Sequence, residues 1–367
     1  MAASPAASPP GPGLRRVRLH FRDFPDLREE LRTWVEAAAV AAPTTPAALL
    51  AWWPAFKRSL SISACNLSRV ARERHLDAKA AEVAASQEAD AAFAEVEAGD
   101  LAALPRAIRA RSAAASAALR AAVGPARRTR HAWLRTGERP SPIITQQVRP
   151  PAACRLIPAL RRPDGTATAN PDEMPGVMAA FWQRICTAAA TDPEARERVL
   201  AALRGAPCRC PAECVEALGS PTVTTAEVLA ALQAAPAGRA PGVDGIPGEL
   251  YQECAPALAA VLAALFSAVM AVDRVPRGLL DGVLSCFHKP GDPTEPENYR
   301  PITLLDTDYR TLARVLARRL LPVLRGVIEP EQTAFLTGRR IADNILLLQL
   351  LPALARAEEQ PGVVDAI

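Results

Sequence analysis

The chain has 367 residues, half of them hydrophobic, so it can bury a large core and is not disordered throughout. Its net charge of +4 is small but unevenly spread, because 101–162 carries thirteen arginines against one acid. Such asymmetry points to an anionic partner, most simply nucleic acid, although a solvated helical face is the alternative. Eight cysteines without a signal peptide lead us to expect reduced thiols and an intracellular protein.

The N-terminal part predicts a tail followed by helices. Residues 1–13 are rich in Pro, Ala and Ser, and we expect them to be a disordered tail. Residues 14–140 predict a helical region with breaks near its prolines, including helices of high alanine propensity at 27–42 and 78–104.

Aromatic and basic residues suggest two further features of this helical region. Trp52, Trp53 and Phe56 stand beside Lys57, which favours a helix-bundle core with a charged rim over a base-stacking surface. Basic residues near its C-terminal end are candidate contacts to a nucleic-acid backbone. They are Arg127, Arg128, Arg130 and Arg135.

Residues 141–215 predict a basic linker region that holds a hairpin and a helix. The segment "RLIPALRRPDGTAT" has a turn sequence between short strands, and Asn170 or Asp172 can cap a helix after it. A cysteine cluster follows at Cys208, Cys210 and Cys214. Its first spacing is one residue and no second ligand pair follows closely, so a thiol-bearing loop is favoured over zinc.

The C-terminal part, 216–367, has the clearest periodicity. A capped helix begins at Thr224 or Thr225, and a charge-free helix at 256–272 has the spacing of a buried soluble helix rather than a membrane span. A later helix, "DTDYRTLARVLARRLLPVLRGV", sets apolar residues on one face and three arginines on another. Those arginines are Arg310, Arg314 and Arg318.

Two strands, at 282–288 and 301–305, predict a hairpin whose inner ends carry Lys289 and Arg300. If the register brings these cations together, an ammonium and a guanidinium fork suit a polyphosphate better than a single carboxylate. From spacing alone, two solvated surface cations are the alternative. A last helix follows, and the chain stops in a strand-like run, "PGVVDAI", which indicates a truncated sequence.

Three ordered blocks carry a family resemblance. "APGVDGIPGELYQE", "HKPGDPTEPENYRPITLLDTDYRTLARVLARRL" and "EQTAFLTGRRIADNILLLQ" resemble reverse transcriptases of non-LTR, LINE-type retrotransposons. The resemblance covers 216–367 and extends weakly upstream, through "HAWLRTGERP". It implies a mainly α fold with a small β component: a helical connecting region, then the fingers of a right-hand polymerase with the palm truncated.

The resemblance implies roles for particular residues. Lys289 and Arg300 would contact the triphosphate of an incoming deoxynucleotide. Other matching residues would lie near template or nucleotide: Asp244, Gly245, Gln332, Phe335, Gly338 and Arg339. Ala334 departs from the glycine usual in the family, and Thr303 replaces a serine.

The carboxylate blocks that hold the catalytic metal ions in this family are missing from the chain. Such polymerases use two metal ions held by carboxylates, in a D-x-x-K-A-F/Y-D block and a later A-D-D turn. Neither block is present. Gap-free extension places the first aspartate just after Ile367, whereas a shorter connector would make it Asp365. We therefore expect no complete catalytic set and no metal site, with Mg²⁺ implied for the full-length enzyme only.

Three hypotheses follow from these patterns. The first is a fragment of an RNA-directed DNA polymerase that binds RNA template, DNA primer and deoxynucleoside triphosphates, inactive by itself and nuclear by family inference. The second is a non-catalytic nucleic-acid-binding remnant that acts through 101–162. The third is a helical scaffold for protein partners. None involves a membrane.

Overall fold

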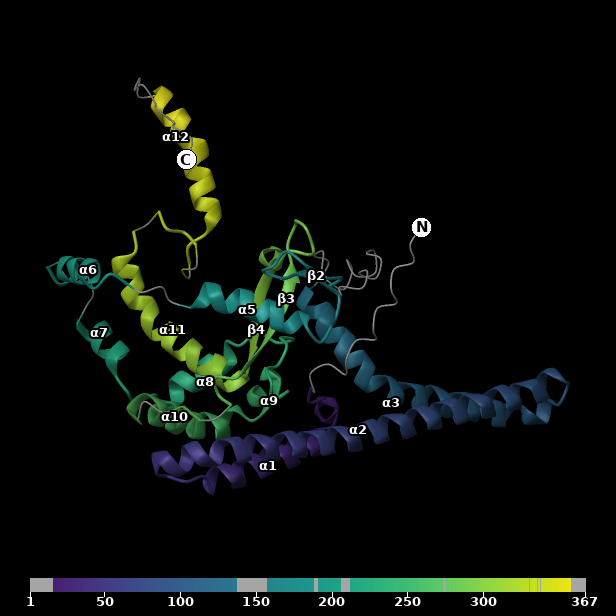
Figure 1. Ribbon diagram of the computed structural model, residues 1–367. Helices are drawn as coiled ribbons and strands as arrows, with labels where there is room; N and C mark the ends of the chain where they lie inside the picture. Colours follow the sequence, from purple (N-terminus) through teal and green to yellow (C-terminus); the bar gives the residue numbers. More distant parts are fainter. Residues whose placement is uncertain are drawn as a thin grey trace.

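Helices dominate the computed structural model, with two short β-hairpins (Figure 1). The structure describes residues 16–136, 157–187, 191–205, 212–272, 275–276, 278–329, 331–334, 336 and 338–357. Its helices are α1 (Pro25–Val40), α2 (Pro46–Glu97), α3 (Leu104–Thr136), α5 (Met174–Cys186), α6 (Pro193–Gly205), α7 (Ala212–Gly219), α8 (Thr225–Gln233), α9 (Gly248–Glu253), α10 (Ala255–Val272), α11 (Thr307–Val327) and α12 (Ile341–Ala357). The prediction of a mainly α protein with a small β component is confirmed.

The four strands pair as β1 (Leu160–Arg161) with β2 (Ala167–Thr168) and β3 (Gly282–His288) with β4 (Tyr299–Leu305), both antiparallel. Short 3₁₀ turns lie at His20–Asp23, Leu101–Ala103 and Pro296–Asn298. Both hairpins, the helix after Asn170 and the capped helix at Thr224 confirm predictions from turn and cap chemistry.

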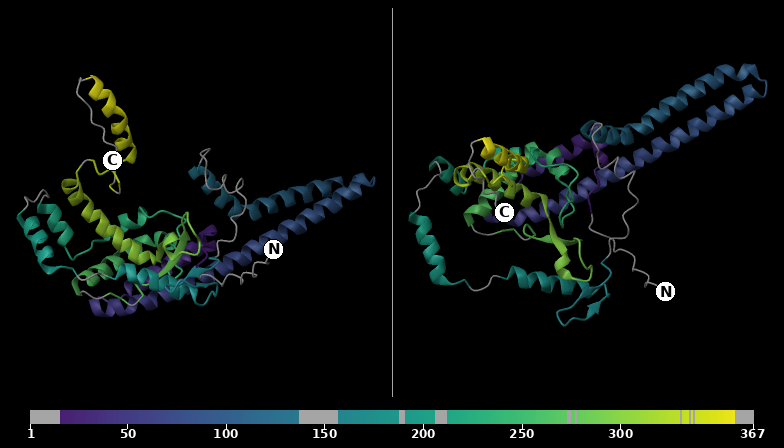
Figure 2. Two further views of the ribbon diagram at one scale, coloured as in Figure 1. Left: turned by 45° about the horizontal axis from the view of Figure 1, so that its top comes forward. Right: turned by 90° about the horizontal axis from the view of Figure 1, so that it is seen from above.

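The helices α2 and α3 form a long antiparallel hairpin that projects from the rest of the molecule (Figure 2). The seam of this hairpin is built from small buried residues, which let the two backbones approach closely. These residues are Ala89, Ala92, Ala107, Ala110 and Ala114. The turn between the helices contains Gly99 at a φ of 105°, a conformation that favours glycine.

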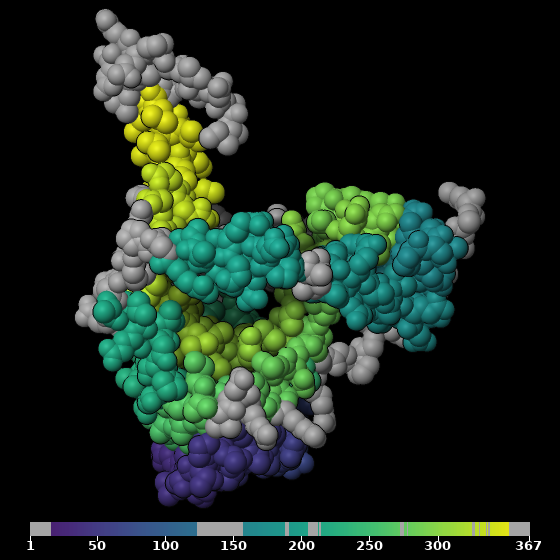
Figure 3. Space-filling view, turned by 60° about the vertical axis from the view of Figure 1, so that its left-hand side comes forward, coloured from purple at the N-terminus to yellow at the C-terminus, as the bar shows by residue number. Residues whose placement is uncertain are grey.

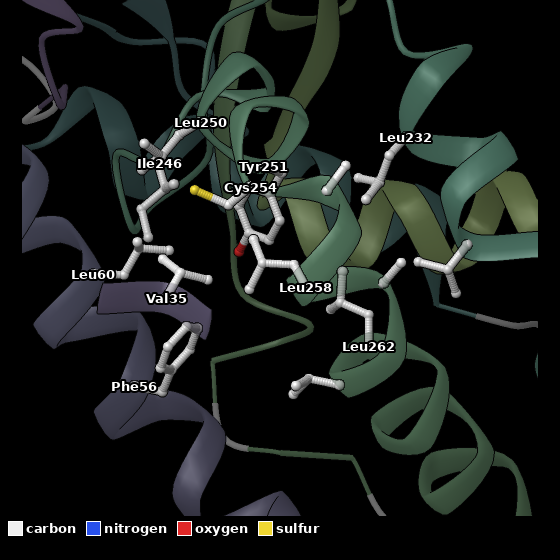
Figure 4. Close-up of a cluster of buried hydrophobic side chains, with 14 of the residues drawn as sticks. Val35, Phe56, Leu60, Leu232, Ile246, Leu250, Tyr251, Cys254, Leu258 and Leu262 are labelled. Atoms are coloured by element: carbon white, nitrogen blue, oxygen red, sulfur yellow. The ribbon is translucent and has the colours of Figure 1, made fainter. Parts of the chain in front are cut away.

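The main core joins α1 and α2 to α9 and α10, which follow much later in the sequence (Figure 4). Val35 of α1 and Leu60 of α2 are fully buried in the same cluster as Leu250, Leu258 and Leu262 of α9 and α10. The predicted connecting region and the predicted fingers region therefore share one core in this structure. The exact domain boundaries stay predictions.

A buried carboxylate adds a polar link between these parts. Glu253 at the end of α9 has a side chain only 2% exposed, and three arginines contact it. Arg22 Nε lies 3.2 Å from one of its oxygens, while Arg28 Nη2 and Arg32 Nη2 lie 2.8 and 2.6 Å from the other. Because a buried charge must be paired, this cluster fixes α1 against α9.

The remaining elements surround a hollow in the surface. Figure 3 shows this hollow between the teal segment that holds α6 and the yellow-green α11. Among the described residues, no helix combines enough length and apolar character to cross a membrane.

Candidate functional site

Lys289 and Arg300 lie at the turn end of the β3–β4 hairpin. Arg300 pairs with Phe287, and the backbone N–H of Lys289 donates to the carbonyl of Asn298 at 2.8 Å. Opposite residues of an antiparallel pair share a face, and side chains alternate along a strand. Lys289 follows Phe287 by two positions, so the register assigns both cations to the same face of the hairpin.

The other face of the hairpin is covered near the turn. Tyr299 is buried there with Leu160 of β1 and Met178 of α5, and Cys286 packs against them. The face of Arg300 stays open, since Phe287 and Ile302 on that face are each 44% exposed. The cation face is therefore accessible to a ligand.

The connecting turn is held by its own hydrogen bonds. Asp292 Oδ1 accepts from both the backbone N–H and the hydroxyl of Thr294, each at 2.8 Å. The Tyr299 hydroxyl donates to the Pro293 carbonyl at 2.7 Å. The N–H of Arg161 on β1 donates to the Thr294 carbonyl at 2.8 Å, so the first hairpin supports the second.

Within the part of the chain that the structure describes, no hydrogen bond or ion pair involves the side chain of Lys289 or Arg300. An ammonium and a guanidinium left unpaired on one open face can attract a multiply charged anion.

A buried ion cluster lies at the base of this hairpin, where β4 ends and α11 begins. Lys57 Nζ from α2 lies 3.0 Å from Asp244, 2.9 Å from Asp306 and 3.1 Å from Asp308. Trp53 Nε1 donates to Asp308 at 2.7 Å. Burial opposes the charge on Lys57, but the three carboxylates hold its pKa well above the ordinary value.

Asp244 belongs to the turn of the first family-like block. Its N–H donates to Asp306 at 3.2 Å and its carboxylate accepts from the N–H of Ile246 at 2.9 Å. Burial raises the pKa of Asp244 to about 6, against the opposing effect of Lys57. Gly245 has a φ of 71°, which favours glycine.

Gly242 allows the close approach that the cluster requires. A Cβ at this position would lie 2.2 Å from Asp306 Oδ1 and 2.4 Å from the Asp306 backbone nitrogen. The turn therefore packs directly onto the end of β4. Sequence reasoning missed this cluster, although the rarity of lysine in the chain was a signal that could have singled out Lys57.

The three aspartates raise the question of a metal ion. One carboxylate oxygen from each lies within 4.8 Å of the others, a spacing that can suit a cation. Lys57 Nζ, however, is within 3.1 Å of all three carboxylates and supplies the positive charge itself. These residues therefore do not fit a resident Mg²⁺ beside the lysine.

The third family-like block forms a loop between α11 and α12. Arg339 donates to the carbonyls of Gln332 at 2.8 Å and Ile328 at 3.0 Å, so its side chain closes the loop on the end of α11. Gly338 has a φ of 89°. Phe335 lies outside the described residues. The predicted closeness of this loop to template or nucleotide stays a prediction.

Two further predictions concern parts that the structure does not describe. Asp365 lies outside the described residues, as do the side chains of the α3 arginines near its C-terminal end. Those arginines are Arg127, Arg128, Arg130 and Arg135. Their proposed contacts to nucleic acid stay predictions.

Comparisons with known proteins find similar transposon-encoded proteins. The chain is 30% identical over 202 residues to the "Transposon TX1 uncharacterized 149 kDa protein" of Xenopus laevis, a match covering 55% of this chain. It is 27% identical over 122 residues to the "Probable RNA-directed DNA polymerase from transposon BS" of Drosophila melanogaster, covering 32% of this chain. It is 28% identical over 110 residues to the "Probable RNA-directed DNA polymerase from transposon X-element" of the same species, covering 29%.

These matches cover only 15%, 14% and 12% of the three relatives. No protein-family model matches the chain. The resemblance drawn from the three sequence blocks is nevertheless confirmed. The chain is a homologue, at modest identity over part of its length, of transposon-encoded proteins and RNA-directed DNA polymerases of non-LTR elements.

Proposed function

We propose that this chain supplies the nucleotide-gripping hairpin of an RNA-directed DNA polymerase of a non-LTR retrotransposon. In this proposal Lys289 and Arg300 contact the triphosphate of an incoming deoxynucleotide. The observation that carries it is the shared open face of two cations without a side-chain partner among the described residues. The chain is also similar to two proteins named as probable RNA-directed DNA polymerases.

The two cations have complementary properties for this task. The Lys289 ammonium is a compact charge on a flexible stem, and the Arg300 guanidinium is a rigid fork that can contact two phosphate oxygens. Arg300 is held by its ladder pair with Phe287 near the turn end of the hairpin, while Lys289 lies where the turn begins. Together they can bind successive phosphates of a triphosphate rather than a single small anion.

The buried cluster gives the hairpin a fixed base. Asp306 directly follows β4, and Lys57 binds it to α2 and to the Asp244 turn. We assign Lys57 a positioning role, because it holds the strand that carries Arg300. Asp244, Gly245 and the loop from Gln332 to Arg339 would then lie toward the template.

The proposal requires no metal held by the described residues. A divalent cation is a general requirement of RNA-directed DNA polymerases, and it neutralises phosphate charge during transfer. The steps assigned here are binding and orientation of the triphosphate by cationic side chains, and nothing more.

The experiment measures affinity of the purified chain for a fluorescent deoxynucleoside triphosphate by anisotropy. Lys289→Ala and Arg300→Ala are each expected to weaken binding about tenfold or more, because a hydrogen bond to a charged group contributes roughly 1.5–3 kcal/mol. Arg198→Ala on α6 is the control, since this arginine is 69% exposed and far in sequence. Equal affinities for all four proteins would refute the proposal.

A further inference from the structure

The helix α11 carries a row of arginines along the edge of its core face, with Arg310 and Arg314 half-buried and Arg318 exposed. Arg310, Arg314 and Arg318 are four residues apart, so they lie one above the other and span about 12 Å of the helix. Leu312 and Val315 point into the main core. The row is called the arginine ridge below.

The part of the chain that the structure describes offers the ridge no acidic partner. Within the described ranges, no carboxylate oxygen lies within 4.0 Å of a guanidinium of these three arginines. The adjacent Arg319 shows the contrast, because its Nε lies 2.6 Å from Glu227 and that contact raises its pKa. Like charges at this spacing destabilise a helix, so a ridge without counter-ions is electrostatically unfavourable.

Burial and the two neighbouring guanidinium groups lower the pKa of Arg314. This agrees with the geometry: the middle arginine lies between two like charges and is partly removed from water. An external anion along the ridge would relieve this repulsion.

Two of these arginines also contact α8. Arg314 Nη1 donates to the Ala231 carbonyl at 3.2 Å and Arg318 Nη1 to the Ala230 carbonyl at 2.9 Å. Each guanidinium has five N–H groups, so one such bond leaves the others available. The contacts therefore hold the side chains in place without neutralising them.

We propose that the arginine ridge binds the phosphodiester backbone of a single-stranded nucleic acid. A row of fixed cations about 12 Å long matches a chain of phosphates. A single small anion would instead need several donors that point toward one place. The partner class rests on the proposed function, but the contact itself is independent of Lys289 and Arg300.

The test is a salt titration of binding to labelled single-stranded oligonucleotides, one of RNA and one of DNA. The variant is Arg310→Gln/Arg314→Gln/Arg318→Gln. A single strand loses about 0.7 in the slope of log K against log salt for each phosphate contact removed. We expect the slope to fall by about 2 and the affinity at low salt to fall at least tenfold.

Three comparisons make the result decisive. Arg196→Gln/Arg198→Gln/Arg204→Gln on α6 removes the same charge from another helix and should leave the slope unchanged. Replacing the ridge arginines by lysine should retain most of the salt slope, because the positive charges remain. If the arginines served only to hydrogen-bond the carbonyls of α8, the salt slope would not depend on their charge. Circular dichroism of every variant establishes that the helices remain folded.

Each outcome decides the proposal. A ridge variant with the wild-type slope, or a wild-type chain that binds neither oligonucleotide at low salt, overturns it. An equal loss for RNA and DNA supports backbone recognition, and a loss for RNA alone identifies RNA as the partner. Nucleotide binding is measured separately, so failure of the Lys289 and Arg300 site leaves this result interpretable.

Discussion

Lys57 is one of three lysines in the chain, and the structure buries it among three aspartates. A single ammonium then faces three carboxylates, and burial, with a smaller contribution from the charge of Asp306, raises the pKa of Asp244. The Tyr251 hydroxyl, which Figure 4 shows within the neighbouring core, is buried without a hydrogen-bond partner among the described residues. We infer that the buried Lys57 cluster fixes how α2, the Asp244 turn and the start of α11 pack together, at some cost in folding stability.

Replacing the lysine tests this reading. Lys57→Met keeps most of the side-chain volume but leaves buried carboxylates unpaired, so the free energy of unfolding should fall by about 3–5 kcal/mol in urea titrations at pH 7. Lys79→Met is the control, because Lys79 is 64% exposed and its ion pair among the described residues is with the neighbouring Glu82. Adding Asp306→Asn to Lys57→Met should restore part of the loss. Similar stability for Lys57→Met and the control would contradict the account.

The raised pKa of Asp244 predicts a pH dependence. An unfolded aspartate titrates near 3.9 and the folded one near 6, so the folded state binds the extra proton between these values. The contribution of Asp244 is fully present below about pH 4 and is lost as pH rises to about 6. Against Asp244→Asn, wild-type stability should therefore decline over this window by about 3 kcal/mol. A difference that is constant from pH 4 to 7 would show that Asp244 stays ionised.

At the scale of elements, local chemistry predicted more than long-range packing. The capping box at Thr224, the two hairpins and the helix at 255–272 follow from short-range signals. The helix expected at 78–104 instead turns back at Gly99. Breaks were expected near prolines in general, but Pro54 lies inside the continuous 52-residue α2.

Tertiary packing explains the continuous helix. Proline removes one backbone hydrogen bond, but Trp53, Phe56 and Leu60 on the adjoining turns are all buried in the main core. The partners of Lys57 could not be predicted, because Asp306 lies 249 residues away in sequence. The shared face of Lys289 and Arg300 could be anticipated from the sequence, because it follows from the pairing register of one local hairpin.

The start of α8 offers an acid-sensitive test of element packing. Glu227 accepts from the N–H of Thr224 at 2.8 Å, and Arg319 of α11 lies 2.6 Å away. The hydrogen bond from Arg319 is the main cause that lowers the pKa of Glu227 to about 2. This contribution is present above about pH 4.5 and is lost as pH falls toward 2.

The measurement is urea unfolding from pH 6 to pH 2.5. Glu227→Gln should be less stable than wild type at pH 6, and the difference should shrink on acidification. Thr224→Ala, a matched cap variant, should cost about 1 kcal/mol with the Arg319 contact retained. A gap between wild type and Glu227→Gln that is the same at both ends of the range would contradict the pairing with Arg319.

At the scale of the whole molecule, one core connects the N-terminal helices α1 and α2 to α8, α9, α10 and α11. Leu60 of α2 and Leu258 of α10 are both fully buried in it. The distal part of the α2–α3 hairpin has a separate alanine seam. We therefore expect one cooperative unit that contains the base of α2, and a projecting hairpin that opens more easily.

Hydrogen exchange read by mass spectrometry checks this division. Leu60→Ala and Leu258→Ala should each cost about 2–5 kcal/mol and should increase exchange in the same set of peptides, from α1, α9 and α10. Ala110→Gly in the distal seam should increase exchange mainly in α2–α3 beyond the core. Independent responses to the two leucine variants would show that the parts unfold separately.

The central claim is that Lys289 and Arg300 together grip the phosphate tail of a deoxynucleotide. The most direct measurement compares the affinities of the wild type and of Lys289→Ala/Arg300→Ala for a deoxynucleoside triphosphate, diphosphate and monophosphate. The account predicts that wild-type affinity rises with each phosphate and that the double variant loses most of this rise. A double variant that discriminates among the three nucleotides as well as the wild type would contradict it.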